Sequence, residues 1–363
     1  MRVVIAGGGT GGHLYPGIAV ARELLARHSG AQVTFVGTSK GIEARVLPRE
    51  GFELDVIRSA GIKGKSIAER VRGAVLVPLG IADSWRALSA RRPDLVIGVG
   101  GYSSGPVLLA AWLRGIPTML LEQNAVPGLT NRLLARLVKA AAVTYESTRA
   151  FFGDRAFLSG NPVRREFVDG SSAGETGSDE PDGTGVLIFG GSQGAHAINM
   201  AMVEAAPRLA SGRRLRITHQ TGEGDLELVK AGYRDAGLDA DVEPFLYDMG
   251  SRLKNADLIV SRAGATTLAE ITAAGKPAIL IPLPTATDDH QRKNAEALAR
   301  AGAAELLLQA DASGERLADL IVAIAADEGR RRRMAQAART LARPEAARVI
   351  VDRALELVAA RAR

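Results

Sequence analysis

The order of apolar and polar positions divides this chain into short apolar runs separated by longer amphipathic stretches. The first runs are RVVIAG at 2–7, QVTFVG at 32–37, DLVIGVGG at 94–101, TMLLEQ at 118–123 and AAVTYES at 141–147. Strands buried on both faces of a parallel sheet consist of such uninterrupted apolar runs, and amphipathic helices connect them. The pattern therefore predicts repeated β-α-β units and an α/β fold.

A polar segment interrupts this pattern near the middle of the chain. Residues 169–185, DGSSAGETGSDEPDGTG, include no large apolar side chain, which predicts a flexible linker. Beyond it the alternation resumes, with strand-like runs GVLIFGG at 185–191, LRITHQTG at 215–222, ADVEPFL at 240–246, ADLIVSRAG at 256–264 and PAILIPLP at 277–284. We therefore expect two α/β domains, residues 1–163 and 164–343. A final helix is expected over 344–363, and its pattern alone places it in the second domain.

Composition narrows the class of protein. The 363 residues are 46% hydrophobic and 24% charged, which is typical of a globular protein with two cores. The absence of cysteine excludes disulfides, thiolate metal sites and a cysteine nucleophile. MRVVIAGGG does not resemble a secretory signal, and no apolar run is long enough to span a bilayer, so we expect a cytoplasmic location.

Charge is distributed unevenly along the chain. Residues 1–168 carry 22 lysines and arginines against 12 acids, whereas the remaining 195 residues carry 24 against 28. Eight of the basic residues lie between Arg58 and Arg92, so an anionic partner is expected there.

Three glycine-rich loops each follow a predicted strand and precede a predicted helix. They are GGGTGGH at 7–13, GGYSSGP at 100–106 and GGSQGAH at 190–196. Such loops allow close approach of phosphate to the free N–H groups of a helix start, although glycine also serves only to make a turn tight. The second strand is followed by Thr38, Ser39 and Lys40 rather than by an acid for the ribose hydroxyls of NAD, which argues against a dehydrogenase.

Several polar side chains follow these strands. His13 ends the first loop, where an imidazole either transfers a proton or caps the helix. Glu270, in SRAGATTLAE at 261–270, either accepts two hydrogen bonds from vicinal sugar hydroxyls or caps its own helix turn. Gln291 and Asn294 are placed on one helix face, where amides read sugar hydroxyls or are simply solvated.

Metal and nucleic-acid sites have little support. The D-x-D pattern at 239–241 is too short to indicate a metal, so no metal or other cofactor is expected. The segment 61–88 combines apolar and basic residues, which suits either binding to an anionic membrane surface or an ordinary helix pair. Nucleic acid is disfavoured because only 4% of residues are aromatic.

Taken together, the motifs resemble the MurG family of peptidoglycan glycosyltransferases over nearly the whole chain. The segments that carry this resemblance are GGGTGGHLYP at 7–16, GGYSSGP at 100–106, EQNAVPGLTN at 122–131, GNPVR at 160–164, GGSQGAHAIN at 190–199, FLYDM at 245–249, SRAGATTLAE at 261–270 and DDHQRKNA at 288–295. The resemblance implies a GT-B architecture of two Rossmann-like domains whose parallel sheets face a cleft. It also implies that the helix 344–363 packs on the first domain.

The resemblance further implies an activity and its substrates. The family transfers N-acetylglucosamine from UDP-GlcNAc to undecaprenyl-pyrophosphoryl-MurNAc-pentapeptide, which converts lipid I to lipid II. The expected reaction is a single inverting displacement by the 4-hydroxyl of MurNAc, without a metal. The implied location is peripheral, on the cytoplasmic face of the bacterial plasma membrane, with cell-wall synthesis and division proteins as further partners.

Site residues are carried over by matching motif. For UDP-GlcNAc they are Thr10, Gly11, Gly12, Asn124, Arg164, Ser192, Leu246, Ala265, Thr266, Thr267, Leu268, Ala269, Glu270 and Gln291. The acceptor diphosphate is expected at Gly101, Tyr102 and Ser104, and the membrane at Ile62, Lys63, Lys65, Leu76, Leu79, Trp85 and Trp112. His13 is expected to act as the base, or to orient the acceptor, with Glu122 as its rival.

The chain departs from the family at one position, and other functions remain as alternatives. Many family members have histidine before the Glu-Gln-Asn triplet, whereas this chain has Leu121, so that histidine has no essential catalytic role here. A GT-B transferase with another acceptor, a UDP-GlcNAc 2-epimerase, a noncatalytic nucleotide-sugar sensor and a nicotinamide oxidoreductase are the alternatives.

Overall fold

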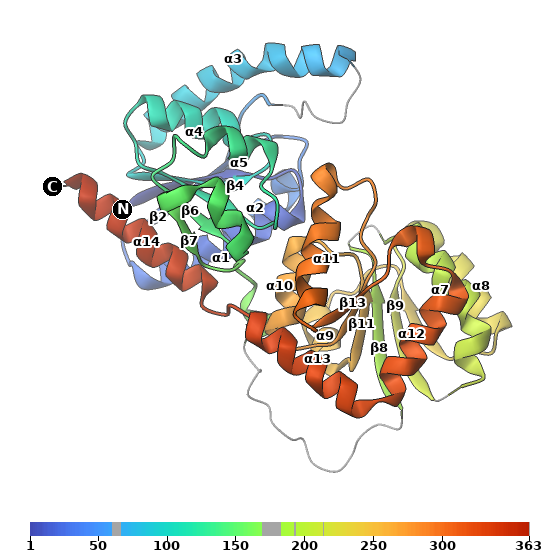
Figure 1. Ribbon diagram of the computed structural model, residues 1–363. Helices are drawn as coiled ribbons and strands as arrows, with labels where there is room; N and C mark the ends of the chain where they lie inside the picture. The colour runs from blue at the N-terminus through green and yellow to red at the C-terminus, as the bar shows by residue number, and fades with distance from the viewer. Residues whose placement is uncertain (60–66, 169–182, 192–193, 213, 363) are drawn as a thin grey trace. The chain divides into compact units, whose positions relative to one another are not determined.

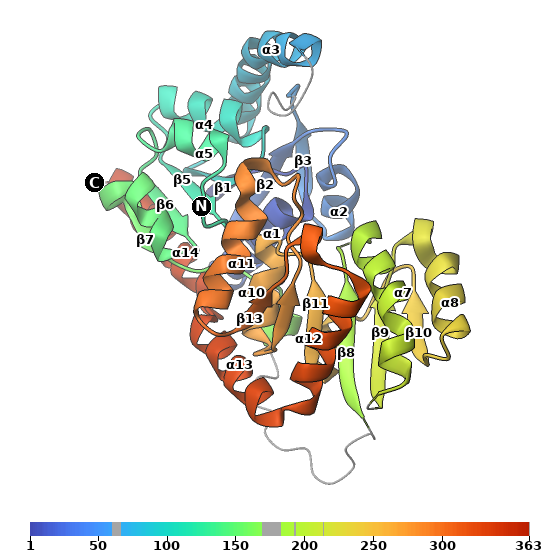
Figure 2. The same cartoon turned by 45° about the vertical axis from the view of Figure 1, so that its right-hand side comes forward.

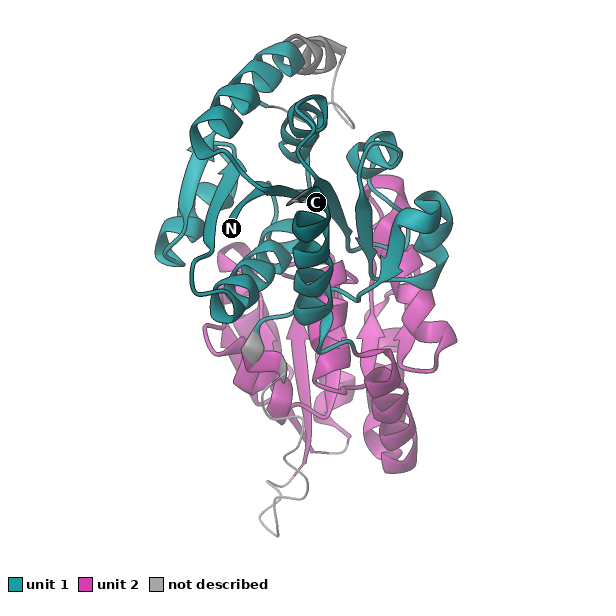
Figure 3. Ribbon diagram, turned by 90° about the vertical axis from the view of Figure 1, so that its left-hand side faces the viewer, with its two compact units in different colours: residues 1–164, 343–363 teal, residues 165–342 magenta. Residues whose placement is uncertain are grey.

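The computed structural model describes residues 1–59, 67–168, 183–191, 194–212 and 214–362, and for 67–75, 165, 168 and 362 it describes the backbone alone. The chain divides into two compact units (Figure 3). Unit 1 comprises Met1–Arg164 and Arg343–Arg363, and unit 2 comprises Arg165–Ala342. Each unit is built on one parallel sheet, which confirms the predicted α/β class of two Rossmann-like domains.

The sheet of unit 1 has seven strands in the order β3-β2-β1-β4-β5-β6-β7 (Figure 1). The strands are β1 Arg2–Gly7, β2 Gln32–Gly37, β3 Glu53–Val56, β4 Leu95–Gly100, β5 Thr118–Glu122, β6 Ala140–Val143 and β7 Ala156–Leu158. The helices are α1 Gly11–Arg27, α2 Glu43–Arg49, α3 Ile67–Arg91, α4 Ser104–Leu113, α5 Leu129–Leu134 and α14 Ala346–Ala362. Short 3-10 turns cover Glu146–Phe151 and Gly153–Arg155.

Alternate residues of the central strands of unit 1 face opposite sides of the sheet, and each side has its own core. Val3 and Ile5 of β1 pack with α1 and with Ile350 of α14. Val4 of β1 packs on the other side with Leu88 of α3 and with residues of α4. The apolar side of α14 is therefore part of the core of unit 1, although this helix is last in the sequence.

The sheet of unit 2 has six parallel strands in the order β10-β9-β8-β11-β12-β13 (Figure 2). The strands are β8 Thr184–Phe189, β9 Leu215–Gln220, β10 Ala240–Glu243, β11 Leu258–Ser261, β12 Ala278–Leu280 and β13 Ala304–Leu306. The helices are α6 Arg165–Val168, α7 His196–Ala210, α8 Leu226–Asp235, α9 Met249–Asn255, α10 Ala265–Ala273, α11 His290–Arg300, α12 Gly314–Ala326 and α13 Glu328–Leu341. Further 3-10 turns cover Glu223–Asp225, Thr287–Asp289 and Gln309–Asp311.

Two details differ from the expected linker and strands. Thr184 and Gly185 belong to β8 and are buried, so the polar segment does not extend to residue 185, and its residues 169–182 lie outside the described part of the chain. The short strands β3, β7 and β13 were not among the predicted runs. They lie at or next to sheet edges, where fewer side chains need to be apolar.

Both strand orders reverse direction at one point, between β1 and β4 in unit 1 and between β8 and β11 in unit 2. In open parallel sheets, ligands bind beside the carboxyl ends of the strands at such a point. The predicted glycine loops begin at the ends of β1, β4 and β8. The topology thus places each loop where a ligand site is expected.

Candidate active site

In unit 1 the glycine loops after β1 and β4 interlock at the carboxyl edge of the sheet. A Cβ atom on Gly101 would lie 2.5 Å from the carbonyl oxygen of Gly8, and one on Gly100 would lie 2.6 Å from Cδ2 of His13. Both positions also have positive φ, +81° and +97°, which favours glycine. The absence of side chains at these two positions lets the imidazole of His13 pack against the backbone of the second loop.

Thr10 and His13 are joined at the start of α1. The hydroxyl oxygen of Thr10 lies 3.2 Å from Nδ1 of His13, while Thr10 itself makes no side-chain cap to the helix. Gly11 and Gly12 form the first turn of α1 between them. The contact orients the imidazole through Nδ1, so Nε2 is the nitrogen suited to proton exchange with a substrate.

Glu43 of α2 supports the first glycine loop, and sequence reasoning did not find it. Its carboxylate accepts hydrogen bonds from the backbone N–H of Gly9 at 2.8 Å, from the N–H of Thr38 at 2.9 Å and from the Thr38 hydroxyl at 2.9 Å. The side chain is fully buried. Because its oxygens serve backbone groups, Glu43 is a positioning residue for the loop that carries His13.

The second loop brings the predicted Gly101, Tyr102 and Ser104 together. The Ser104 hydroxyl donates to the carbonyl of Gly101 at 2.9 Å, and Ser59 donates to the carbonyl of Tyr102 at 3.1 Å. The Tyr102 ring stays 37% exposed beside Gly9. The hydroxyl proton of Ser104 is thus used within the loop, whereas the Tyr102 ring is accessible.

Glu122 ends β5, the strand next to β4, and is 2% exposed. One carboxylate oxygen accepts from the backbone and side-chain N–H groups of Asn124 at 3.0 and 3.3 Å. The other accepts from the N–H of Gly128 at 3.0 Å and from Asn131 at 2.8 Å. Burial raises the pKa of Glu122, and these donors oppose the rise. The carboxylate therefore holds the loop 122–131 in shape.

Arg164 and Leu121 complete the residues of interest in unit 1. The guanidinium of Arg164 lies over the ring of Tyr15, 5.2 Å from its centroid, and that ring lies against Gly11. Leu121 is 2% exposed and packs in the core, where an imidazole would be buried among apolar side chains. The leucine at this position is a core residue.

Unit 2 contains a cavity of about 570 Å³ at the carboxyl edge of its own sheet. It lies beside the ends of β8 and β11, at the point where the strand order reverses. Its lining residues are Phe189, Gly190, Gly191, Gly194, Ala195, His196, Ala197, Arg262, Gly264, Thr267, Leu283, Gln291 and Gln309. A cavity of this size accepts a ligand as large as a nucleotide.

Arg262 is the cationic side chain of this cavity, and sequence reasoning did not assign it a role. Its guanidinium donates to the carbonyls of Ile281 and Pro282 at 3.1 and 3.2 Å and to the side-chain oxygen of Gln309 at 2.8 Å. Burial lowers the pKa of Arg262. Within the described residues its hydrogen bonds go to neutral oxygens, so its positive charge is available to an anionic ligand.

The predicted amide pair separates into two roles. The side-chain oxygen of Gln291 accepts from the backbone N–H of Ala263 at 3.3 Å and of Leu283 at 3.0 Å, and its amide nitrogen takes no part in these two bonds. Asn294 is fully buried and donates to the carbonyl of Ala263 at 3.4 Å. Gln291 lines the cavity, and Asn294 supports the strand end beneath it.

The predicted run from Ala265 to Glu270 forms the first turns of α10. The helix begins after Gly264 without a side-chain cap, so the N–H groups of its first turn, which includes Thr266, lie beside the cavity. Thr267 lines that cavity, Ala269 is half-buried, and Leu268 is 1% exposed, so Leu268 offers a ligand its backbone rather than its side chain. Glu270, on the next turn, is 7% exposed.

Gln220 connects two of the predicted segments. Its side-chain oxygen accepts from the N–H of Leu246 at 3.1 Å, and its amide donates to the carbonyl of Gly191 at 2.8 Å. Leu246 is 2% exposed, so it offers its backbone rather than its side chain to the loop after β8. Ser192, the other predicted residue of the loop, lies outside the described residues.

The D-x-D pattern does not belong to this site. Asp241 pairs with Arg252 at the start of the edge strand β10. Across the part of the chain that the structure describes, no group of three histidine or acidic side chains is placed to hold a metal ion.

The candidate membrane residues are only partly described. Ile62, Lys63 and Lys65 lie outside the described residues. The helix α3 packs against α4 and buries Gly80, Ser84 and Leu88. Leu76 is half-buried. The exposed side chains are Leu79, Trp85 and Trp112, and the two tryptophans are 45% exposed each. The described part of this segment therefore forms a packed helix pair and also exposes apolar side chains. No helix in the described ranges has the length and apolar character needed to cross a bilayer.

Comparison with known proteins places both units in one family. Residues 3–143 match the glycosyltransferase family 28 N-terminal domain, and residues 185–350 match the corresponding C-terminal domain. A Pelobacter propionicus protein named UDP-N-acetylglucosamine--N-acetylmuramyl-(pentapeptide) pyrophosphoryl-undecaprenol N-acetylglucosamine transferase is 52% identical, over 98% of this chain and 99% of its own length. The chain belongs to the MurG family. The predicted resemblance is thereby confirmed.

Further MurG relatives agree with this assignment. A Geobacter sulfurreducens protein of the same name is 51% identical over 97% of both chains. The crystal structure of MurG from Acinetobacter baumannii matches with a TM-score of 0.78 and 34% identity, covering 97% of this chain and 98% of that one. A UDP-GlcNAc 2-epimerase from Neisseria meningitidis has a TM-score of 0.68 at 15% identity, a likeness of fold alone.

Proposed function

We propose that this chain transfers N-acetylglucosamine from UDP-GlcNAc to the 4-hydroxyl of MurNAc in undecaprenyl-pyrophosphoryl-MurNAc-pentapeptide, which converts lipid I to lipid II. The observation that carries the proposal is the 52% identity, over 98% of the chain, to a relative named for this reaction. The geometry of the two ligand-binding edges supports it, because a transferase needs one place for the donor and one for the acceptor.

Unit 2 binds the nucleotide sugar in this proposal. Its cavity holds the UDP moiety, with the diphosphate at the uncapped start of α10 and beside Arg262. Glu270 accepts hydrogen bonds from the ribose hydroxyls, and the amide of Gln291 donates to the sugar or the diphosphate. Gly190, Gly191 and Gly194 line the same cavity, and Ser192, which lies outside the described residues, is assigned to UDP-GlcNAc by its motif alone. By matching motif, Thr10, Gly11, Gly12, Asn124 and Arg164 also contact UDP-GlcNAc in this proposal.

Unit 1 binds the acceptor and supplies the base. The acceptor diphosphate contacts the loop of Gly101, Tyr102 and Ser104, and the 4-hydroxyl lies near Nε2 of His13. As that hydroxyl attacks the anomeric carbon, its proton passes to His13 and the bond to the UDP oxygen breaks, with inversion at the anomeric carbon. The four N–H donors around Glu122 already occupy its oxygens, which favours His13 as the base.

The leaving UDP gains negative charge on its diphosphate in the transition state. A fixed guanidinium and the N–H groups of a helix start stabilise such charge without reorganising. Arg262 is held by three neutral oxygens, so its position does not depend on the ligand. No step in this scheme needs a metal or another cofactor.

The acceptor is a lipid, so the enzyme works at a membrane surface. We place it on the cytoplasmic face of the bacterial plasma membrane as a peripheral protein. The exposed Leu79, Trp85 and Trp112, together with the basic residues before them in the sequence, contact the anionic leaflet. Cell-wall synthesis and division proteins are its proposed protein partners.

One assay tests the reaction directly. The purified chain is incubated with radiolabelled UDP-GlcNAc and a short-chain lipid I analogue in the presence of EDTA. We expect a labelled disaccharide lipid with an inverted linkage. Two results contradict the proposal. One is epimerisation of the sugar of UDP-GlcNAc without formation of a disaccharide. The other is full binding of UDP-GlcNAc with no turnover, even with native lipid and added magnesium.

A further inference from the structure

Three adjacent strands of unit 2 end side by side at the carboxyl edge of its sheet, and Gln220 ends the middle one. The strand order places β9 between β8 and β10. In the register of these strands, Gln220 pairs with Phe189 of β8 and with Glu243 of β10. The glycine loop after β8 and the segment 244–246 after β10 therefore begin on either side of residues 220–222.

The glycine loop rests on one side of residues 220–222. The amide nitrogen of Gln220 donates to the carbonyl of Gly191 at 2.8 Å. Gly194 has a φ of +74°, and a Cβ atom there would collide with the carbonyl of Thr221, which also accepts from Asn199 at 2.9 Å. Contacts with this short segment thus place the described ends of the loop.

The segment after β10 is held on the other side of residues 220–222. The side-chain oxygen of Gln220 accepts from the backbone N–H of Leu246 at 3.1 Å. The N–H groups of the two residues after Gln220 donate to the carbonyls of Glu243 and Pro244 at 3.0 and 3.1 Å. These three bonds fix the backbone of Leu246 relative to the end of β9.

The side chain of Gln220 thus contacts both sides at once. It is 2% exposed and is not among the residues that line the cavity, so it acts on a ligand only through its neighbours. Its nitrogen needs an acceptor and its oxygen needs a donor, and the carbonyl of Gly191 and the N–H of Leu246 supply them. A geometry that is fixed before the ligand arrives lowers the entropy cost of binding.

The two sides suit different parts of UDP. Gly191 lines the cavity proposed for the diphosphate, and the N–H groups of glycine loops suit phosphate. Leu246 offers a neutral backbone, and its neighbours Phe245 and Tyr247 form an edge-to-face pair with ring centroids 4.9 Å apart. These rings are 38% and 93% exposed, and exposed aromatic rings stack on uncharged bases. The segment at Leu246 therefore suits the nucleoside.

We infer that Gln220 is a positioning residue that fixes the phosphate-binding loop at Gly191 and the nucleoside-binding segment at Leu246 at the spacing that one UDP molecule requires. The inference rests on the proposed function, since it takes the cavity of unit 2 as the site of UDP-GlcNAc. A ligand that spans both sides depends on their spacing, whereas a ligand that reaches only one side does not. Loss of Gln220 therefore weakens UDP more than it weakens either part of UDP.

Calorimetric titration of the full chain with UDP, uridine and pyrophosphate tests the inference. Q220M keeps the length of the side chain and removes its amide. We expect its affinity for UDP to fall about tenfold, and its affinity for uridine or pyrophosphate alone to change by about twofold or less. The matched control is T184V, which removes a buried hydroxyl that donates to the carbonyl of Ala325 at 3.5 Å, at the other end of β8. It is expected to lower the melting temperature and to bind UDP like the parent.

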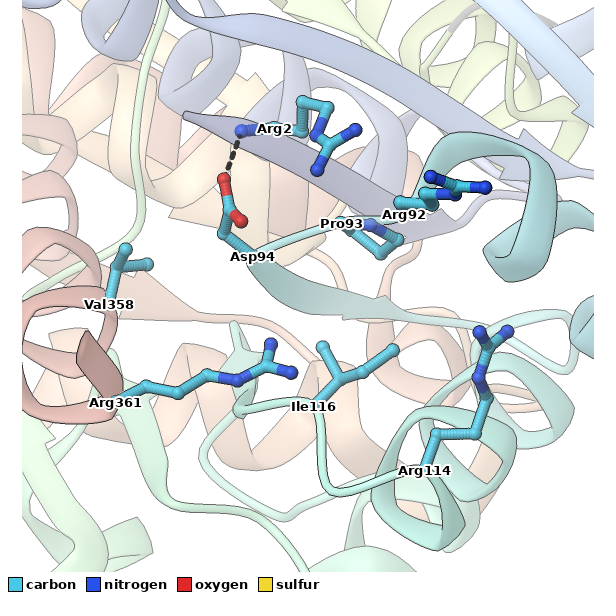
Figure 4. A pocket seen from close by; sticks show the side chains of 8 residues that line it. All are labelled: Arg2, Arg92, Pro93, Asp94, Arg114, Ile116, Val358 and Arg361. Carbon is cyan, nitrogen blue, oxygen red and sulfur yellow. Dashed lines mark hydrogen bonds between the residues drawn. The ribbon is translucent and has the colours of Figure 1, made fainter.

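Pyrophosphate needs a control of its own, because unit 1 has a cavity of about 430 Å³ that also suits an anion (Figure 4). Its lining includes Arg2, Arg92, Arg114 and Arg361, and Asp94 accepts the backbone N–H of Arg2 at 2.7 Å. We therefore titrate pyrophosphate into R92Q/R361Q, with and without Q220M. The difference between these two proteins reports on unit 2.

A second variant, Q220N, keeps a buried amide that is too short to reach both sides, and it is expected to show the same selective loss of UDP affinity. Equal losses for UDP, uridine and pyrophosphate, the same loss of UDP affinity in T184V, or parent-like UDP affinity in Q220M or Q220N overturns the inference. A parent that binds UDP and forms no disaccharide lipid overturns the proposed function alone, and a parent that does not bind UDP overturns both.

Discussion

The carboxylate of Glu43 accepts the backbone N–H of Gly9 at 2.8 Å, although 34 residues separate them in the sequence. Glu43 begins α2, and Gly9 belongs to the loop that ends in α1 and His13. The shape of the loop next to the proposed base therefore depends on an acid from the following β-α unit. This relationship, rather than the glycine pattern alone, fixes where the start of α1 lies.

We expect E43Q to lower kcat by tenfold or more and to destabilise unit 1 by about 1–3 kcal/mol. The amide can satisfy only part of the three hydrogen bonds, and a buried N–H that faces another N–H loses its partner. Thermal unfolding and turnover measure the two effects. E50Q, which changes a half-buried acid paired with Arg22 after the same helix, is the control. If E43Q matches E50Q in turnover, Glu43 does not position the loop.

H13A is expected to lower kcat by about 10²–10⁴, the usual contribution of a general base, with UDP-GlcNAc affinity within twofold of the parent. The reason is that His13 is proposed to take the proton of the acceptor hydroxyl and is not among the residues proposed to contact UDP-GlcNAc. Steady-state kinetics and calorimetric titration with UDP separate the two quantities. H28A, at the other end of α1, serves as the control. A loss of donor affinity without a loss of kcat would remove His13 from the proton transfer.

E270A is expected to weaken UDP binding by about 10- to 150-fold, because a lost hydrogen bond to a charged group costs about 1.5–3 kcal/mol. The same variant should bind the 2′,3′-dideoxy analogue as the parent does, since that ligand lacks both ribose hydroxyls. E296Q on α11, whose acid pairs with exposed Arg292, is the matched control. Unchanged UDP affinity in E270A would refute the ribose contact.

The stability of unit 2 is expected to fall as the pH drops below about 6.5. His219 is fully buried, with Nδ1 2.7 Å from the Tyr233 hydroxyl and Nε2 3.1 Å from the side-chain oxygen of Asn199. Burial lowers the pKa of His219 to about 3, which the charge of Asp225 opposes. Between these pH values the unfolded chain binds a proton that the folded one excludes.

The expected loss from this histidine is about 2 kcal/mol between pH 7 and pH 5, at about 1.4 kcal/mol per pH unit below 6.5. Urea unfolding followed by circular dichroism at the two pH values measures it. H219Q removes the titrating group, so its stability should depend less on pH, whereas H28Q should behave as the parent. A parent and an H219Q variant with identical pH dependence would contradict the assignment.

Most of the fold follows from the apolar runs, because a strand buried on both faces requires them. The central strands β1, β4, β8 and β11 coincide with predicted runs. The edge strands β3 and β13 do not, since ELDV at 53–56 and AEL at 304–306 are partly exposed and alternate with acids. The local pattern placed the last helix in the second domain, whereas α14 packs in unit 1. Periodicity shows which side of a helix is buried, but it does not show which other element covers that side.

The candidate site was predictable where a motif is contiguous. The glycine loops, His13 and the run from Ala265 to Glu270 follow directly from strand ends. Glu43, Gln220 and Arg262 were not predicted, because their contacts join segments distant in sequence. Arg262 alone had a local signal, a cation directly after an apolar strand. Glu122 illustrates the converse: a carboxylate at a strand end suggests catalysis, but its burial and donors are visible only in three dimensions.

The division of the chain makes unit 2 an insertion within unit 1. The side chain of Arg343 lies against Gly160, so the chain re-enters unit 1 next to where it left. During translation, unit 2 is complete once residue 342 has left the ribosome, whereas the core of unit 1 still lacks Ile350, Val351 and Ala354. The later part of the chain is therefore able to reach its native state before the earlier part, the reverse of the usual N-terminal-first order. The apolar surface of α1 stays uncovered until α14 has been synthesised, so unit 1 cannot complete its core when only its first 164 residues have been made.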